Sequence, residues 1–327
     1  MYYLGMDGGG TKTAFIIINE KGNIVASHQT RGSYYLQIGF DGFYEVINEG
    51  LNKILNKADL SISDINYSFL GLPGFGEILE DMPRIKVIIK QIFPDNKYSC
   101  GNDVEVSWAG TLACQPGINL VAGTGAIGFG RDQKGNTARA SGWGEFCGDE
   151  GSAYWIGKET IMLFTKEADG RLEKTPVYQI IKEHYSLKRD LDLLTLVHDR
   201  LEMKRDAIAQ FSRLLYQAAE SDDKRAQDIF KKAAYENSLT VKALVNKLDF
   251  DNDKIIKISY SGGVFKAEKH ILEPLINYLN DYQVKLVKPI LEPVLGAALY
   301  ALEIDGKVSN LQPVVENLVG NQENHVF

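Results

Sequence analysis

Cysteine is scarce in this chain of 327 residues. The three cysteines, Cys100, Cys114 and Cys147, are far apart and form no C-x-x-C pair. This pattern excludes a disulfide framework and a cysteine-paired zinc site, and it is typical of reduced thiols. We therefore expect a cytoplasmic protein.

Long apolar runs and an excess of positive charge are also absent. No apolar stretch approaches the roughly 18 residues of a membrane-spanning helix, and the N-terminus lacks the basic and apolar regions of a signal peptide. The formal net charge is −7, which argues against general binding to nucleic acid or to an anionic membrane. A phosphate-bearing ligand would therefore need local positive potential from backbone N–H groups, a lysine or a metal ion.

Strand and helix patterns alternate along the chain, whose length favours two domains. Three strands come first, followed by helix, strand, helix, strand and helix, and this order partly restarts after Gln115-Pro116-Gly117. The pattern predicts an α/β protein with a duplicated βββαβα unit, with domains at 1–115 and 116–327 and a helical insert at about 149–248. The strands are expected at 2–4, 14–18, 24–30, 67–72, 97–100, 118–122, 126–130, 137–140, 255–260 and 284–287.

The first predicted hairpin carries a glycine-rich turn. Asp7 ends its first strand, Gly8-Gly9-Gly10 follow, and Thr11-Lys12-Thr13 lead into the next strand. Glycine lets backbone N–H groups approach a ligand closely, and a row of them suits phosphate. Asp7 is placed to hold Mg²⁺, directly or through water. The turn is not a P-loop, because the lysine comes one position late and a strand follows; an ordinary glycine-rich hairpin is the alternative.

Two further strand ends carry residues suited to catalysis or ligand binding. Their position is informative because α/β folds bind ligands at strand ends. Asp103 begins a helix, where it can cap that helix or act as the base for an alcohol attacking a phosphoryl group. The run Gly123–Gly128 matches the dinucleotide pattern G-x-G-x-x-G, but a strand follows it where that motif needs a helix. We interpret it as a second phosphate turn, with an ordinary hairpin as the alternative.

Aromatic and acidic residues are dense between Ser141 and Trp155. An aromatic face beside carboxylates suits a neutral polyhydroxy ligand, although Asp149 or Ser152 could simply cap the following helix. The turn Ser261–Val264, between a strand and a helix, suits a nucleoside packed against backbone, although an ordinary strand–helix turn would look similar.

In this order, the motifs resemble those of the N-acetylglucosamine kinases in the BadF/BadG/BcrA/BcrD ATPase branch of the actin/hexokinase/Hsp70 superfamily. The resemblance covers nearly the whole chain, and its most specific part is the run Gly148–Trp155. It implies two actin-like (ribonuclease H-like) domains with βββαβα cores around a central cleft, with the last helix able to pack back on the first domain. It also implies ATP, Mg²⁺, a small amino-sugar substrate and, as is common in this family, a homodimer.

The resemblance assigns roles to individual residues. Asp103 would take the proton from the sugar 6-hydroxyl, and Asp7 would belong to the Mg²⁺ shell, through water. ATP and phosphate contacts would come from Gly9, Gly10, Thr11, Lys12, Thr13, Gly123, Thr124, Gly125, Ala209, Gly262, Gly263 and Val264. Sugar contacts would come from Tyr34, Asn102, Asp103, Ala126, Ile127, Gly142, Trp143, Gly144 and Asp149.

The sugar contacts depart from the family pattern at two places. Tyr34 stands where characterised relatives have an asparagine, and Ala126-Ile127 where the family often has Ser-Asn. Polar contacts are thus lost or replaced by more apolar ones. Glucosamine, N-acetylglucosamine and N-acetylmuramic acid all stay open as substrates, and the lack of an evident carboxylate-rich pocket for a free ammonium favours an N-acetylated sugar.

Two other functions share parts of this pattern. An ATPase that activates a dehydratase or a CoA-ester reductase would hold an iron–sulfur cluster through cysteines near the nucleotide site, but Val121-Ala122 stands where its cysteine is expected. A non-enzymatic actin-like scaffold or a sugar-responsive regulator is the other alternative, and no segment is left over for the DNA-binding helices of a regulator. An ATP-dependent amino-sugar kinase is the main expectation.

Overall fold

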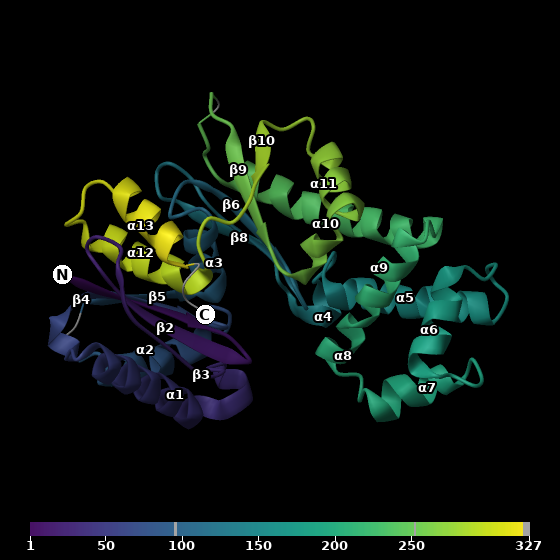
Figure 1. The fold of residues 1–327 in the computed structure, drawn as a ribbon, viewed down its shortest axis with the longest axis horizontal. Helices are drawn as coiled ribbons and strands as arrows, with labels where there is room; N and C mark the ends of the chain where they lie inside the picture. Colours follow the sequence, from purple (N-terminus) through teal and green to yellow (C-terminus); the bar gives the residue numbers. More distant parts are fainter. Residues whose placement is uncertain (95–96, 252, 323–327) are drawn as a thin grey trace. The chain divides into compact units, whose positions relative to one another are not determined.

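Two five-stranded sheets organise the chain in its computed structural model, which describes residues 1–94, 97–251 and 253–322. The strand orders are β3-β2-β1-β4-β5 and β10-β9-β6-β7-β8 (Figure 1). In each sheet the first strand is central, with its antiparallel hairpin partners on one side and two parallel strands on the other. The two sheets therefore share one topology, which confirms the predicted α/β fold with a duplicated βββαβα unit.

Contacts between residues divide the chain into two compact units, Met1–Pro116 with Lys288–Phe327, and Gly117–Val287. The division groups the C-terminal segment with the first unit. The expected domains have their boundary after residue 115, with the last helix able to pack back on the first domain. The elements of the first unit are β1 (Tyr2–Gly8), β2 (Lys12–Asn19), β3 (Ile24–Arg31), α1 (Tyr35–Ala58), β4 (Ile65–Leu72), α2 (Met82–Ile92), β5 (Tyr98–Asn102), α3 (Asp103–Thr111), α12 (Pro293–Asp305) and α13 (Gln312–Gln322), with short 3₁₀ turns at Ile62–Asp64 and Leu79–Asp81.

Side chains on β1 alternate between the two faces of its sheet, as the period of two requires. Leu4 and Met6 belong to the core that α1 and α2 complete. Gly5 points to the other face, where a Cβ placed on it would lie 2.3 Å from the backbone nitrogen of Ala298 in α12. Figure 1 shows α1 and α2 on one side of this sheet and α12 on the other. The sheet is thus covered on both faces.

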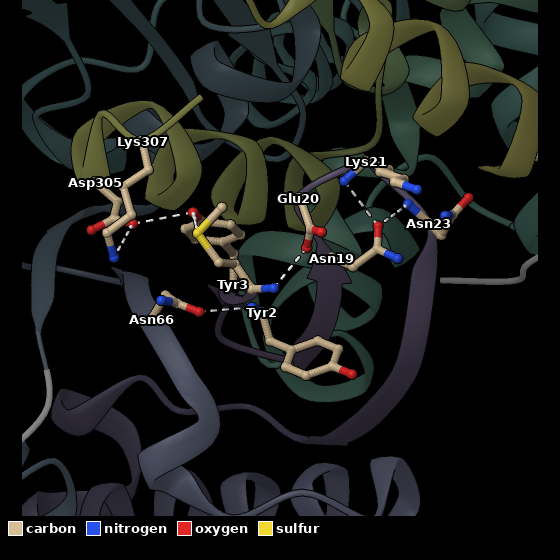
Figure 2. A network of polar contacts seen from close by, with 10 residues as sticks. Tyr2, Tyr3, Asn19, Glu20, Lys21, Asn23, Asn66, Asp305 and Lys307 are labelled. Carbon is tan, nitrogen blue, oxygen red and sulfur yellow. Dashed lines mark hydrogen bonds and ion pairs between the residues drawn. The ribbon is translucent and has the colours of Figure 1, made fainter. Parts of the chain in front are cut away.

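Polar contacts at the start of β1 also involve the C-terminal segment (Figure 2). The Tyr3 hydroxyl donates to Asp305 Oδ2 at 3.1 Å, and Lys307 pairs with the same carboxylate at 3.1 Å. Burial, with a smaller contribution from Asp305, raises the pKa of Tyr3 above its ordinary value. The phenol therefore stays neutral and donates, and it ties the end of α12 to the first strand.

The second unit holds the predicted helical insert between β8 and β9. Its helices α5, α9 and α10 contribute many of the buried residues in the core that also contains β6 and β9. None of the helices in the described parts of the chain has the length and apolar character needed to span a membrane. The elements are β6 (Gly117–Ala122), β7 (Ala126–Arg131), β8 (Thr137–Ser141), α4 (Gly144–Cys147), α5 (Ala153–Ala168), α6 (Pro176–Tyr185), α7 (Asp192–Thr195), a π-helical turn (Leu196–Arg200), α8 (Arg205–Ala209), α9 (Phe211–Glu220), α10 (Lys224–Lys247), β9 (Ile256–Ser261), a 3₁₀ helix (Gly263–His270), α11 (Leu272–Tyr278) and β10 (Val284–Val287).

Candidate active site

The first sheet brings Asp7 and Asp103 to one edge. Asp7 pairs in register with Gly71 of β4, and Gly71 pairs with Gly101 of β5. Both pairings are parallel, so the carboxyl ends of the three strands meet at the same edge. Asp103 follows β5 directly, as the first residue of α3.

The environment of Asp7 disfavours its negative charge. The pKa of Asp7 is raised from 3.8 to about 7, mainly by burial and to a smaller degree by the charge of Asp103, with Lys12 acting in the opposite direction. Glu292, at the start of α12, also contributes to the rise. Sequence reasoning missed Glu292 because it is far from Asp7 along the chain and belongs to no recognisable motif. The three acids create a local negative potential that a cation would relieve.

A divalent cation beside Asp7 would need further ligands, such as water and substrate phosphates, to complete its coordination shell. In the described residues, no group of three or more histidine, cysteine or acidic side chains is arranged to hold a metal ion. Mg²⁺ commonly takes one or two carboxylates and completes its shell with waters and substrate phosphates. The chemistry of Asp7, an acid whose charge is costly without a cation, fits that kind of site.

Asn102, and not Asp103, caps helix α3. Its Oδ1 accepts a hydrogen bond from the Val104 N–H at 3.2 Å, while its Nδ2 donates to the Phe75 carbonyl at 3.2 Å. The capping role considered for Asp103 is therefore wrong, because that residue occupies the first helical position. The cap fixes the start of α3, and with it the backbone that carries Asp103.

The first glycine turn closes the β1–β2 hairpin, as predicted. Thr13, buried and opposite Gly8, has a hydroxyl without a hydrogen-bond partner in the described structure. The same holds for the buried Ser33 hydroxyl, which lies 2.6 Å from where a Cβ on Gly8 would be. Buried hydroxyls normally have partners, so this pair fits a turn that receives a polar ligand. Sequence reasoning found Thr13 but missed Ser33, which stands in an ordinary loop.

The other predicted residues of this turn lie toward its tip. Gly10, Thr11 and Lys12 are exposed. Gly9 is partly buried and held by two backbone bonds: its N–H donates to the Lys12 carbonyl, and its carbonyl accepts from the Ser33 N–H, each at 3.0 Å. The tip therefore presents backbone and a lysine while its base is held firmly.

Tyr34 contacts the turn that follows β4. A Cβ on Gly74, which has φ +76°, would lie 2.9 Å from Cε2 of Tyr34. The same turn supplies the Phe75 carbonyl that Asn102 binds. Tyr34 and Asn102, two of the predicted sugar contacts, therefore both lie against the turn that follows β4.

The second glycine turn and the turn after β9 touch each other in the second unit. The Gly123 N–H donates to the Gly125 carbonyl at 2.9 Å across the β6–β7 hairpin. β9 runs parallel to β6, so both turns lie at the carboxyl edge of this sheet. Gly262 has φ +102°, and a Cβ there would lie 2.4 Å from the Ala122 carbonyl oxygen and 2.8 Å from Gly123 N. Only glycine fits this approach.

A pocket of about 190 Å³ opens beside the turn after β9. Its volume is below the roughly 300–1,000 Å³ of sites that enclose a whole ligand, so it suits one part of a ligand, such as a nucleotide base. Ala209 lies nearby, because Ser212 Oγ donates to its carbonyl at 2.7 Å. The sequence indicated Gly263 and Val264 but not the other lining residues, Ile156, Ser212, Arg213, Tyr216, Phe230, Lys266 and Ala267.

Asp149 is buried against the second glycine turn. Its side chain accepts from the Ala126 N–H at 3.3 Å and pairs with Arg205. Burial raises the pKa of Asp149, while Arg205 and the Ala126 N–H act in the opposite direction. Ser152 caps α5 by accepting from the Trp155 N–H at 3.1 Å. Capping by Ser152 is therefore confirmed, and capping by Asp149 is wrong.

The remaining predicted sugar contacts differ in exposure. Ala126 is 3% exposed, so its contact with a sugar stays a prediction that its burial does not favour. Ile127 packs on Gly142, where a Cβ would lie 2.6 Å from its Cδ1. Gly142 and Gly144 have φ of +72° and +83°, which explains the glycines around Trp143. The Trp143 side chain is 76% exposed and can contact a ligand.

The three cysteines lie in different environments. Burial raises the pKa of Cys100 to about 12. Cys114 is buried and Cys147 is exposed. Since iron–sulfur clusters are held by thiolates, these positions give no support to the dehydratase-activator alternative.

Comparison with known proteins gives the relatives of the chain. It is 31% identical over 313 residues to an N-acetylmuramic acid/N-acetylglucosamine kinase from Clostridium acetobutylicum, covering 92% of this chain and 98% of the relative. It is 29% identical over 312 residues to an N-acetyl-D-glucosamine kinase from Dictyostelium discoideum, covering 92% and 97%. A solved structure of a candidate N-acetylglucosamine kinase from Chromobacterium violaceum shares the fold, with a TM-score of 0.70 and 22% identity over 92% of this chain and 98% of that one.

The family assignment rests on a match to nearly the whole chain. The sequence profile of the BadF/BadG/BcrA/BcrD ATPase family matches residues 4–301. That span runs from the first glycine hairpin into α12 and includes both sheets. The chain belongs to the BadF/BadG/BcrA/BcrD ATPase family.

Proposed function

We propose that this protein is an ATP-dependent kinase that phosphorylates the 6-hydroxyl of an amino sugar. N-acetylglucosamine or a close relative, N-acetylmuramic acid or glucosamine, is the substrate. Membership of an ATPase family supports ATP as the donor, and the names of the relatives support the sugar class. The observation that carries the proposal is the position of Asp103, which begins α3 at the same sheet edge as Asp7.

In the proposed reaction Asp103 is the general base. It takes the proton of the 6-hydroxyl while the sugar oxygen forms a bond to the γ-phosphorus of ATP. The bond from that phosphorus to the bridging oxygen breaks, and ADP leaves. Asp7 would hold Mg²⁺, through water, and Mg²⁺ would neutralise charge at the phosphates when bound.

Nucleotide binding is proposed at two kinds of turn. The pocket beside Gly263 and Val264 takes the base, and the adjoining turn Gly123–Gly125 takes phosphate. The hairpin at Gly9–Thr13 supplies further phosphate contacts, including the exposed Lys12. Backbone N–H groups in such turns stabilise phosphate charge without a large net positive charge on the protein.

Sugar contacts are proposed around Tyr34, Asn102, Trp143 and Asp149. Tyr34 replaces a polar side chain by an aromatic one, whose ring can pack on the methyl group of an acetamido substituent, and the sequence shows no evident carboxylate-rich pocket for a free ammonium. An N-acetylated sugar is therefore the proposed preference. The homodimer implied by the family resemblance is proposed as well, and light scattering of the purified protein tests it.

One panel of assays tests the reaction and the preference. ADP release is measured with MgATP and, in turn, glucose, glucosamine, N-acetylglucosamine and N-acetylmuramic acid. Release that depends on an N-acetylated sugar is the expected result. ADP release that no sugar stimulates would contradict the kinase proposal, and ATP-driven filament growth in its place would favour the scaffold.

The substitution Asp103→Asn tests the role of the base. We expect kcat to fall by roughly 10²–10⁴-fold, which is what general-base catalysis contributes. ATP affinity, measured by calorimetry, should change little because Asp103 contacts the acceptor. Asp41→Asn, which removes an exposed acid of α1, is the matched control. The role is wrong if Asp103→Asn keeps more than about a tenth of the wild-type kcat.

A further inference from the structure

Arg205 lies directly over the second glycine turn. A Cβ placed on Gly125 would be 2.4 Å from Arg205 Nη2 and 3.1 Å from Asp149 Oδ2. Nη2 pairs with that same carboxylate oxygen, while Nε lies 3.5 Å from Glu145 Oε2. The ion pair between Arg205 and Asp149 therefore packs on the turn itself. In this arrangement the guanidinium occupies space that a side chain at position 125 would need, and glycine leaves that space free.

Asp149 depends on this partner for its charge. Its side chain is 3% exposed, and a carboxylate removed from water needs a close cation or hydrogen-bond donors to stay ionised. The Ala126 N–H supplies one donor at 3.3 Å, and Arg205 supplies the positive charge. Glu145 and Glu150, the other charged groups that face Asp149, act against its ionisation. If the guanidinium were lost, one backbone N–H would remain to stabilise the Asp149 carboxylate. That single donor would have to offset both its burial and the repulsion from Glu145 and Glu150.

The turn is held from two sides. From one side, α5 donates its first backbone N–H groups: Ala153 to the Gly123 carbonyl at 2.8 Å and Tyr154 to the Thr124 carbonyl at 3.3 Å. From the other side, Asp149 binds the N–H that follows Gly125. The attachment through Asp149 in turn depends on Arg205, at the start of α8.

We propose that Arg205 is a positioning residue for phosphoryl transfer: by pairing with Asp149, it keeps that carboxylate on the Ala126 N–H and holds Gly123–Gly125 in the shape that receives phosphate. The inference rests on the proposed kinase function, since it concerns the same turn. No motif in the sequence points to this arginine, which is separated from Asp149 by 56 positions.

Kinetics of three variants test the proposal. Arg205→Met should raise the KM for ATP about tenfold or more, because misplacement of a binding turn is costly, with a smaller fall in kcat at saturating ATP. As the pH is lowered, the kcat/KM of Arg205→Met should begin to fall at a higher pH than that of the wild type, because an unpaired Asp149 takes up a proton more readily. Arg205→Lys keeps the charge and should restore most of the affinity and the pH profile. Arg200→Met, which removes an exposed arginine nearby, is the control.

Amide hydrogen exchange gives a readout that needs no turnover. The Ala126 N–H should exchange faster in Arg205→Met than in the wild type, Arg205→Lys and Arg200→Met, because its acceptor is no longer held. The proposal would be overturned if Arg205→Met changed neither the exchange rate of the Ala126 N–H nor the pH profile. A lower thermal stability without either of these two changes would also overturn it, because it would indicate a purely structural role. If no sugar stimulates ADP release in the wild type, the kinase function fails, while the exchange result still decides whether Arg205 holds the turn.

Discussion

Asp7 is an acid held where its negative charge is unfavourable. Burial is the main cause, and the neighbouring charge of Asp103 adds to it. Sites that bind cations often have this character, since like charges are tolerated where a ligand will neutralise them. The cost is therefore expected in the metal-free protein and should be relieved when MgATP binds.

The pH dependence of stability tests this reading of Asp7. Its pKa is raised from 3.8 to about 7 in the folded protein, so the folded state binds this proton more tightly than the unfolded state does. The stabilisation is complete below the unfolded value and is lost as pH rises through the folded value. We expect the Tm of the metal-free wild type to fall between about pH 4 and about pH 7 more steeply than the Tm of Asp7→Asn.

Thermal melts of both proteins across this range provide the measurement. Because other groups titrate as well, the difference between the two curves isolates Asp7. Asp41→Asn should run parallel to the wild type, since Asp41 is exposed. Parallel curves for Asp7→Asn as well would contradict the expected cost.

The residues found from the sequence and those missed differ in a simple way. Asp7 and Asp103 follow apolar strands directly, and glycines beside Asp7 are a local signal. Ser33, Glu292 and Arg205 carry no such signal, and only their partners in the structure reveal them. Strand ends can be read from periodicity, whereas a side chain that approaches from another element cannot.

At the scale of elements, α3, the helix that begins at Asp103, crosses α12 at close range near its other end. A Cβ on Gly296 would lie 2.0 Å from the backbone nitrogen of Gly110, and one on Gly110 would lie 2.8 Å from the Glu292 carbonyl oxygen. The two helices therefore meet backbone to backbone. The chain before α12 adds hydrogen bonds to the end of α3, from Ile290 N–H to Thr111 and from Leu291 N–H to Gly110, each 3.1 Å.

Gly296→Ala tests how closely this crossing is tuned. The added methyl meets backbone, which cannot move aside as a flexible side chain can, so we expect a loss of about 1–3 kcal/mol in the free energy of unfolding. A fall in kcat should accompany it, because α3 begins at Asp103. Urea denaturation and the ADP assay measure the two effects.

Gly320→Ala in α13 is the matched control for this substitution. Nothing lies within 4 Å of a Cβ at that position, so alanine should be neutral or should stabilise the helix by up to about 1 kcal/mol. Equal stability changes for the two variants would show that the α3–α12 contact is less tight than its geometry indicates.

At the scale of the whole molecule, the first unit is built from both ends of the chain. The segment Lys288–Phe327 groups with Met1–Pro116, and the sheet formed by the N-terminal strands is covered on one face by α12. That helix is largely buried, through Val294, Leu295, Gly296, Ala297, Ala298, Leu299, Ala301 and Leu302. The N-terminal part alone would therefore leave the area of this face that α12 covers in water.

Truncation after Val287 tests this dependence. Amide exchange in β1 and β4 should become much faster, because their cover is gone, while β6 and β9 of the other unit should keep most of their protection. Truncation after Gly306 removes α13 but leaves α12 in place, so its effect on β1 should be clearly smaller. Full protection of β1 without residues 288–327 would show that the N-terminal unit is complete by itself.

The sequence alone determined the two glycine hairpins, the alternation that makes the fold α/β, and the strand ends at Asp7 and Asp103. These are local properties, because strand period, glycine content and chain direction act over a few residues. The tertiary structure decided which strands pair, that Asn102 caps α3, that α12 covers the first sheet, and that Arg205 reaches Asp149 across 56 positions. Such contacts join residues far apart in the chain and depend on how whole elements pack, so no local pattern could specify them.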